Sequence, residues 1–149
     1  MDMRLSKLYF SNNELRCKCS CGGLKLDHVF DKMLLELRLD FSQAMHVNSC
    51  CRCKKHNTSV GGNAHSFHVF DRPFYPTQGT CAIDIDRKDA QYNDKLALTA
   101  WKHGWSIGVH PKFIHLDCRA FVTDLPQNVF SYAGATTEAD LKHFKDLVK

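Results

Sequence analysis

Several histidine and aspartate residues of this sequence could together hold a divalent metal ion. They fall in three separate stretches of the chain, one after a glycine-rich turn and two in or near apolar runs. A catalytic zinc site needs about three such ligands and one coordination position left open for water. Zinc held in this way polarises a carbonyl group and lowers the pKa of its water, which favours hydrolysis. The candidates are His65, His68, Asp84, Asp86, His110, His115 and Asp117.

The aspartate pair lies in a predicted β-strand. Residues 81–86 alternate between apolar and polar side chains, so Asp84 and Asp86 should share one face of the strand. A shorter strand is expected around residues 45–47. Residues 50–62 contain asparagine and a glycine pair, which predicts turn and loop.

A second group of candidate ligands lies at a predicted strand pair. Residues 105–109 and 113–118 have the composition of two short strands joined by a turn at Pro111. On the second strand, His115 and Asp117 are two positions apart and should therefore share a face. Metal ligands at the edges of neighbouring strands are a common way to assemble an open site.

Helical patterns separate these strands. Residues 28–39 carry apolar side chains at helical spacing behind a capping candidate, Asp27. Residues 89–103 show a second apolar stripe, which ends where Gly104 can terminate a helix. A third capped helix is expected after Thr137.

Composition favours one globular domain, residues 1–149, with 44% hydrophobic and 24% charged residues. The formal net charge of +4 is too small to require nucleic acid as a partner, yet it favours contact with an anionic polymer such as a cell wall. We predict no membrane span and, because the first ten residues lack an apolar stretch, no signal peptide.

Eight cysteines are many for this length, and six of them fall into two groups, at positions 17, 19, 21 and 50, 51, 53. Neither group has the two-residue gap of a zinc ribbon or knuckle. Reduced, buried thiols are the simplest interpretation, and disulfides or a second metal between the groups are the alternatives.

Five motifs, in order, make the sequence resemble the M15 peptidases, in particular the branch related to zinc D-Ala-D-Ala carboxypeptidases, which shares its fold with the hedgehog signalling domain. Together with the cysteine-containing start, the resemblance covers roughly residues 8–119. It implies an α+β fold in which a small antiparallel sheet carries a zinc site and packs against helices. The motifs are SCCRCKKHN (49–57), VGG (60–62), SFH (66–68), AIDI (82–85) and FIHLD (113–117).

Carried over position by position, the resemblance implies that His68, Asp84 and His115 bind Zn²⁺. It also implies that Arg52 holds a substrate carbonyl or carboxylate oxygen, and we place Ser66 with it in substrate binding. A planar guanidinium, with its fork of N–H donors, suits such an oxygen. An arginine of this kind also commonly pairs with a carboxylate for structural reasons.

The general base is less clearly marked. Some family members carry a catalytic histidine five positions before the last ligand, which is His110 here, whereas others use an acid at the position of Lys112. Because lysine cannot replace a carboxylate base, we predict that His110 and Asp117 act as a pair. Asp117 could instead support His115 from behind. The remaining histidines of this region, His56 and His65, are interpreted as loop residues.

The spacing between the first two ligands is longer here than is common in the family. The surplus lies around residues 70–79, an aromatic, proline-containing loop that could border a substrate groove. Loop insertions of this kind cost little free energy. They make Asp71 a rival ligand, although Asp84 fits the motif better.

The resemblance implies zinc-dependent hydrolysis of a peptide bond in the stem or cross-bridge peptides of bacterial peptidoglycan, by an endopeptidase or a D,D-carboxypeptidase. We expect a monomeric, phage endolysin-like enzyme, either released from the host cytoplasm to the cell wall or virion-associated. Two other functions stay open: a non-catalytic zinc module of the same fold, and a cysteine-rich zinc protein that binds nucleic acid.

Overall fold

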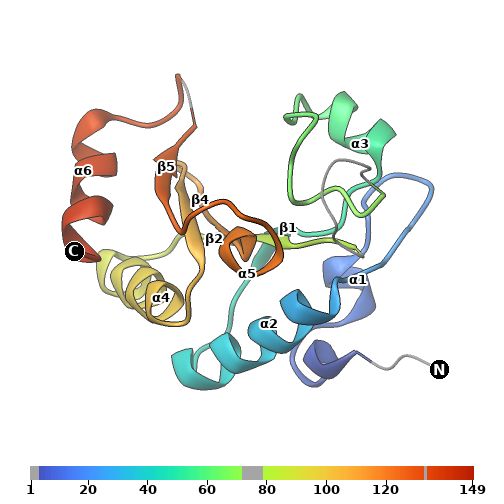
Figure 1. The fold of residues 1–149 in the computed structure, drawn as a ribbon, viewed down its shortest axis with the longest axis horizontal. Helices are drawn as coiled ribbons and strands as arrows, with labels where there is room; N and C mark the ends of the chain where they lie inside the picture. Colours follow the sequence, from blue (N-terminus) through green and yellow to red (C-terminus); the bar gives the residue numbers. More distant parts are fainter. Residues whose placement is uncertain (1–3, 72–78, 133) are drawn as a thin grey trace.

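The computed structural model describes residues 4–71, 79–132 and 134–149, which form a five-stranded mixed sheet and surrounding helices (Figure 1). The strands lie in the order β1-β2-β4-β3-β5. Neighbours among β1 to β4 pair antiparallel, whereas β5 runs parallel to β3. The predicted α+β class is confirmed, with one parallel strand added to the antiparallel sheet. The strands are β1 (Val47–Ser49), β2 (Ala82–Asp86), β3 (Ser106–Val109), β4 (Phe113–Asp117) and β5 (Val129–Ser131).

The predicted helices correspond to α2 (His28–Phe41), α4 (Ala90–Lys102) and α6 (Glu138–Leu147). Each begins after a side chain that accepts a backbone N–H of the first turn, from Asp27, Asp89 and Thr137 respectively. α4 packs against β3, β4, α2 and α6, and α6 also contacts β3 and β5. These helices bury apolar side chains of the sheet in one continuous core.

The pairing of β2 with β4 decides which side chains leave that core. Asp84 lies directly opposite His115 in the ladder, and Ile83 lies opposite Leu116. Side chains alternate along a strand, so the isoleucine and leucine enter the apolar core, whereas the aspartate and histidine project from the other face. The polar face of the sheet is therefore the face that carries the candidate metal ligands.

One prediction was wrong in the segment between β1 and β2. Residues 50–62 were predicted as turn and loop, but they contain the short helix α3 (Lys54–Ser59). Cys53 caps this helix through Sγ, which accepts the N–H of His56. α3 lacks an apolar stripe, and such a stripe is the signal by which sequence analysis recognises a helix.

The remaining helical segments are short: η1 (Leu5–Leu8), α1 (Asn12–Leu15) and α5 (Arg119–Val122). In Figure 1 the chain that follows α1 lies beside the α3 segment, apart from α4 and α6. Among the described residues, no helix has both the length and the apolar character needed to cross a bilayer.

Candidate metal centre

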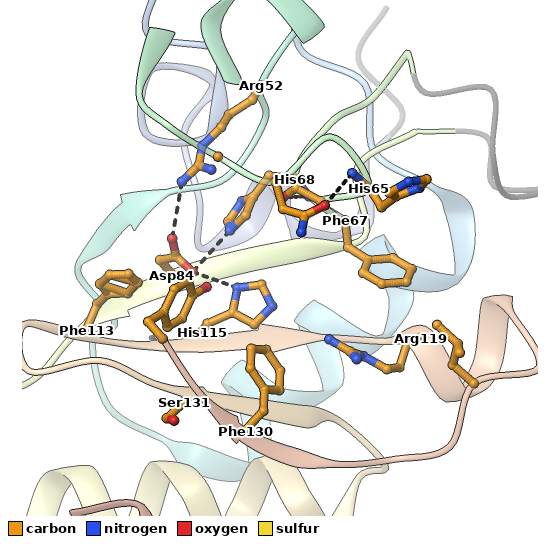
Figure 2. Close-up of a pocket in the computed structure, with 15 residues that line it drawn as sticks. Arg52, His65, Phe67, His68, Asp84, Phe113, His115, Arg119, Phe130 and Ser131 are labelled. Carbon is orange, nitrogen blue, oxygen red and sulfur yellow. Dashed lines mark hydrogen bonds and ion pairs between the residues drawn. The ribbon is translucent and has the colours of Figure 1, made fainter. Parts of the chain in front are cut away.

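His68, Asp84 and His115 meet on the polar face of the sheet (Figure 2). One nitrogen or oxygen from each lies within 4.8 Å of the others, and all three residues are buried. Asp84 Oδ1 lies 3.1 Å from His68 Nε2 and 2.9 Å from His115 Nδ1. The structure thus brings together, from β2, β4 and a turn, the three residues that the resemblance implied as ligands.

The three side chains reach this point for different reasons. Asp84 and His115 are cross-strand partners, so the sheet itself sets their separation. His68 lies in a turn outside the sheet, and its carbonyl oxygen accepts hydrogen bonds from Arg52 N at 3.0 Å and Thr80 Oγ1 at 2.8 Å. These two bonds tie the turn to the chain before α3 and to the start of β2.

The second nitrogen of each imidazole is also engaged. His68 Nδ1 donates to the carbonyl oxygen of Cys50 at 2.7 Å, and His115 Nε2 donates to Asp117 Oδ2 at 2.8 Å. Arg119 holds Asp117 in turn, with Nε 2.9 Å from Oδ1 and Nη2 2.7 Å from Oδ2. Such outer partners orient the rings and raise their basicity toward a metal.

The charges of this group favour a cation at its centre. Burial lowers the pKa of His115, but the hydrogen bonds and charges of Asp117 and Asp84 outweigh burial and raise this pKa to about 9. Burial raises the pKa of Asp84, and the two histidines outweigh it, so the carboxyl pKa lies well below its usual range. The two carboxylates thus stabilise a positive charge between Asp84 and His115.

These residues fit a zinc ion by the chemistry of their donors. Two imidazole nitrogens and one carboxylate oxygen are the ligand set of many catalytic zinc sites, which keep a fourth position open. The raised pKa of His115 means that its imidazole holds a second proton when no metal is bound. A divalent cation can replace this proton, because metal binding normally releases protons from its ligands.

The group opens into a pocket of about 420 Å³. Its walls include four aromatic rings and two guanidinium groups, and His115 makes edge contacts with two of these rings. In Figure 2 the labelled aromatic side chains surround the ligand group, and Arg52 and Arg119 lie on opposite sides of it. The wall residues of these two kinds are Phe67, Phe113, Phe130, Tyr132, Arg52 and Arg119.

A profile of the Peptidase M15 family matches residues 8–117, which hold all three candidate ligands. The chain belongs to the Peptidase M15 family. Comparison with curated proteins gives no match. The match confirms that the chain is a member of the family that its motifs resemble. Members of this family are zinc-dependent peptidases.

In this M15 peptidase, Arg52 is held by its neighbours. Its guanidinium donates to Ser49 Oγ at 3.0 Å, to Asn57 Oδ1 at 3.3 Å and to Asp84 Oδ2 at 3.5 Å. These contacts use three of the five N–H donors of an arginine and fix the plane of the group. Because Arg52 also lines the pocket, its remaining N–H donors can bind a molecule in the pocket without rotation of the group.

The other predicted site residues have different environments. Ser66 lines the pocket, and its hydroxyl accepts the N–H of His68 at 3.2 Å. Asp117 is fully buried, and both of its oxygens accept hydrogen bonds from its partners His115 and Arg119. Burial raises the pKa of Asp117, but the bonds from Arg119 and His115 outweigh it and bring the pKa to about 2.

His110 stacks on Phe113, with 4.1 Å between ring centroids, and meets the edge of Tyr132 at 5.7 Å. Its Nδ1 accepts the N–H of Lys112 at 3.1 Å. In the neutral ring the proton therefore lies on Nε2, which is a donor. Burial lowers the pKa of His110 and outweighs the negative charge of Asp84, which raises it; the positive charges of Lys112 and Arg87 act in the same direction as burial. The neutral form is thereby favoured.

The rival ligand Asp71 lies elsewhere, since its Oδ1 accepts the N–H of Lys54 at the start of α3. Most of the proline-containing insertion, residues 72–78, is outside the described residues. The sequence did not mark Tyr132 or Arg119, and His65, one of the first candidates, was interpreted as a loop residue, yet all three line the pocket. Arg119 and Tyr132 come after the last motif, and no pattern of residue types marks either of them. His65 lies in a stretch typical of a loop, where histidines are common.

Proposed function

We propose that this M15 peptidase hydrolyses a peptide bond in bacterial peptidoglycan, with Zn²⁺ held by His68, Asp84 and His115. The observation that carries the proposal is the buried ligand group itself. Its three donors converge, the outer nitrogen of each imidazole is bonded, and the group faces a pocket. A purely structural zinc would instead be enclosed by four protein ligands.

Bound zinc would polarise the scissile carbonyl and activate a water molecule for attack. Arg52 would bind the carbonyl oxygen or a terminal carboxylate through the donors that Ser49, Asn57 and Asp84 leave free. Its three fixed contacts mean that the guanidinium needs little reorganisation when negative charge develops nearby.

His110 acts as a hydrogen-bond donor in this proposal. Its Nε2–H can donate to negative charge that develops on the substrate, because Nδ1 already accepts from Lys112 N and the neutral ring keeps its proton on Nε2. Asp117 acts through His115 as a positioning residue, since both of its oxygens are bonded within the protein. In this proposal the pair predicted from the sequence divides into a hydrogen-bond donor that stacks on the pocket-wall residue Phe113 and a support behind a ligand.

The substrate class follows from the family resemblance and from charge. A net charge of +4 favours the anionic wall polymer, and aromatic walls suit a short peptide in an extended form. The partners we propose are stem or cross-bridge peptides. We further propose that the chain acts as a monomer, without nucleic acid or membrane partners, in a phage endolysin-like setting at the cell wall.

The test is digestion of purified peptidoglycan by the full chain, with and without a metal chelator, followed by mass analysis of the soluble products. We expect hydrolysis that the chelator abolishes and added zinc restores. Release of free D-alanine would identify a carboxypeptidase, and release of larger peptide fragments would identify an endopeptidase. Absence of any cleaved peptide bond in the zinc-loaded protein would contradict the proposal.

A matched pair of variants links the activity to the site. His68→Ala should abolish hydrolysis and remove one zinc ion per chain. His46→Ala should change neither, because His46 is an exposed histidine outside the ligand group. A His68→Ala protein with full activity would contradict the assignment of the metal ligands.

A further inference from the structure

Four cysteine sulfurs converge at a second place, remote in sequence from β2 and β4. Cys17, Cys19 and Cys21 come from the chain after α1, and Cys53 is the residue that caps α3. Their Sγ atoms all lie within 4.8 Å of one another. The two cysteine groups of the sequence thus contribute unequally, three members from the first and one from the second.

The separations match a metal rather than a disulfide. Sγ of Cys17 lies 3.5 Å from that of Cys19 and 3.9 Å from that of Cys53, and the Cys19–Cys53 separation is 3.6 Å. Tetrahedral zinc with Zn–S bonds near 2.3 Å places sulfurs about 3.8 Å apart. A disulfide requires about 2.05 Å, and all eight cysteines are free.

Each of the four sulfurs also accepts a backbone N–H. Sγ of Cys17 accepts from Cys53 at 3.4 Å, and Sγ of Cys19 accepts from Cys21 at 3.4 Å. Sγ of Cys21 accepts from Gly23, and Sγ of Cys53 accepts from His56, both at 3.3 Å. Hydrogen bonds of this kind stabilise the thiolate, which is the form that binds metal. They contribute to lowering the pKa of Cys19 to about 7, whereas at Cys21 the bond with Cys19, together with desolvation and the other sulfurs, outweighs the Gly23 N–H and raises the pKa to about 12.

A tight turn explains how one-residue gaps still give convergent sulfurs. Gly22 has a φ of +56°, and its N–H bonds to the Cys19 carbonyl at 3.2 Å. Cys17 N donates to the Gly23 carbonyl at 2.7 Å. The chain therefore folds back on itself and returns Cys21 to the other two sulfurs.

We propose that Cys17, Cys19, Cys21 and Cys53 bind a second zinc ion, which has a structural role. Four thiolates complete the tetrahedral shell of zinc and leave no position for water, so this site carries no hydrolytic chemistry. Binding releases the protons of those cysteines that are still thiols.

The second ion would hold in place the segment around Cys53, and the site of His68, Asp84 and His115 depends on this segment. Cys53 directly follows Arg52, whose backbone N–H and carbonyl bond to the His68 carbonyl at 3.0 Å and to Phe70 N at 3.1 Å. The cysteine loop also lies against this region, because a Cβ on Gly23 would come within 2.5 Å of the Phe70 ring. A metal that ties Cys53 to the loop therefore restrains both Arg52 and the turn that presents His68.

Metal analysis of the purified full chain, reduced and loaded with zinc, tests this inference. We expect two zinc ions per chain in the wild type, one in His68→Ala and one in Cys21→Ala. Cys21 is the exposed member of the four, so its substitution disturbs the core least. The matched control is Cys118→Ala, a buried cysteine outside the group, which should keep both ions.

Cobalt substitution gives a second readout that needs no cysteine variant. Co²⁺ bound to the His68→Ala protein should show the intense thiolate-to-metal charge-transfer absorption of a tetrathiolate site. Absence of that absorption, rapid alkylation of all four thiols in the zinc-loaded protein, or a disulfide found by mass analysis would each overturn the inference. So would a wild-type protein whose only zinc is lost in His68→Ala.

The outcome is independent of the proposed peptidase activity. A chain that keeps one zinc in His68→Ala, loses it in Cys21→Ala and cleaves no peptidoglycan would support the second site while contradicting the proposed function. A chain that cleaves peptidoglycan with a single zinc at His68 would do the reverse.

Discussion

The two candidate metal sites of this protein are built on different supports. His68, Asp84 and His115 depend on the β2–β4 ladder and on bonds to the outer nitrogens of the imidazoles. The cysteine group lies in loops, where backbone N–H groups bond to the sulfurs. The first site has three donors beside a pocket, whereas the second has four. An open site suits chemistry and a closed one suits structure, so each substitution below should affect one site far more than the other.

Asp84→Asn should have the largest effect on activity. An amide is a poor zinc ligand, so we expect hydrolysis of peptidoglycan to fall by about 10³-fold or more, equivalent to the several kcal/mol that a metal supplies. Metal analysis should show the loss of one zinc and retention of the cysteine-bound one. Asp86→Asn, two positions along the same strand, is the control and should keep both ions. Loss of both ions from Asp84→Asn would contradict the conclusion that the two sites bind metal independently.

His110→Asn should come next, with kcat lowered by about 10²-fold, the lower range for loss of a hydrogen-bond donor to developing negative charge. Zinc content should not change. Because the pKa of His110 lies below its usual value, wild-type kcat should fall only when the pH drops below that lowered pKa, as protonation of Nδ1 breaks the bond from Lys112. The pH profile of the variant should lack this acid limb. If the variant kept the same fall in kcat at low pH, His110 would have no part in the reaction.

Asp117→Asn tests the support behind His115. We expect zinc affinity at the open site to fall by about 10–100-fold, the usual cost of losing such a partner. Activity should recover at high zinc concentration, and the cysteine site should keep its ion. Titration of activity against free zinc measures this directly. If excess zinc fails to restore kcat, the aspartate does more than position the ligand.

Cys21→Ala should have the smallest effect on activity and a clear effect on stability. We expect kcat/KM of the folded protein to fall by less than about tenfold, or about 1.4 kcal/mol of transition-state stabilisation. Loss of the second zinc should lower Tm by more than about 4 °C, which corresponds to more than about 1 kcal/mol for a chain of this size. Calorimetry with and without zinc checks this. Equal Tm values for wild type and variant would speak against a structural ion.

Much of the fold could be predicted because periodicity and caps are local. Asp27 and Thr137 cap helices as predicted, and β2 and β4 occupy the expected stretches. β5 was not predicted, because a three-residue strand is too short for periodicity to mark it. α3 was predicted as loop. The helix could not be recognised from the sequence because its cap is a cysteine sulfur and its residues are polar.

The candidate ligands were implied by motif order, and the structure brings them together. Their surroundings could not be predicted in the same way. Arg119 bonds to Asp117 from the start of α5, and Tyr132 reaches the pocket from the end of β5. Neither residue belongs to a motif, so only the path of the chain between strands reveals them. His65 is similar, since a histidine in a turn has no pattern that separates a wall residue from a surface one.

By itself the sequence determined the residue types, the order of the motifs and the local elements, because these depend on neighbours along the chain. Only the tertiary structure decided which donors meet. Cross-strand register places Asp84 opposite His115, and a glycine turn brings Cys21 back to Cys17 and near Cys53. Metal coordination depends on distances of a few ångströms between residues far apart in sequence, and such distances arise only when the chain has packed.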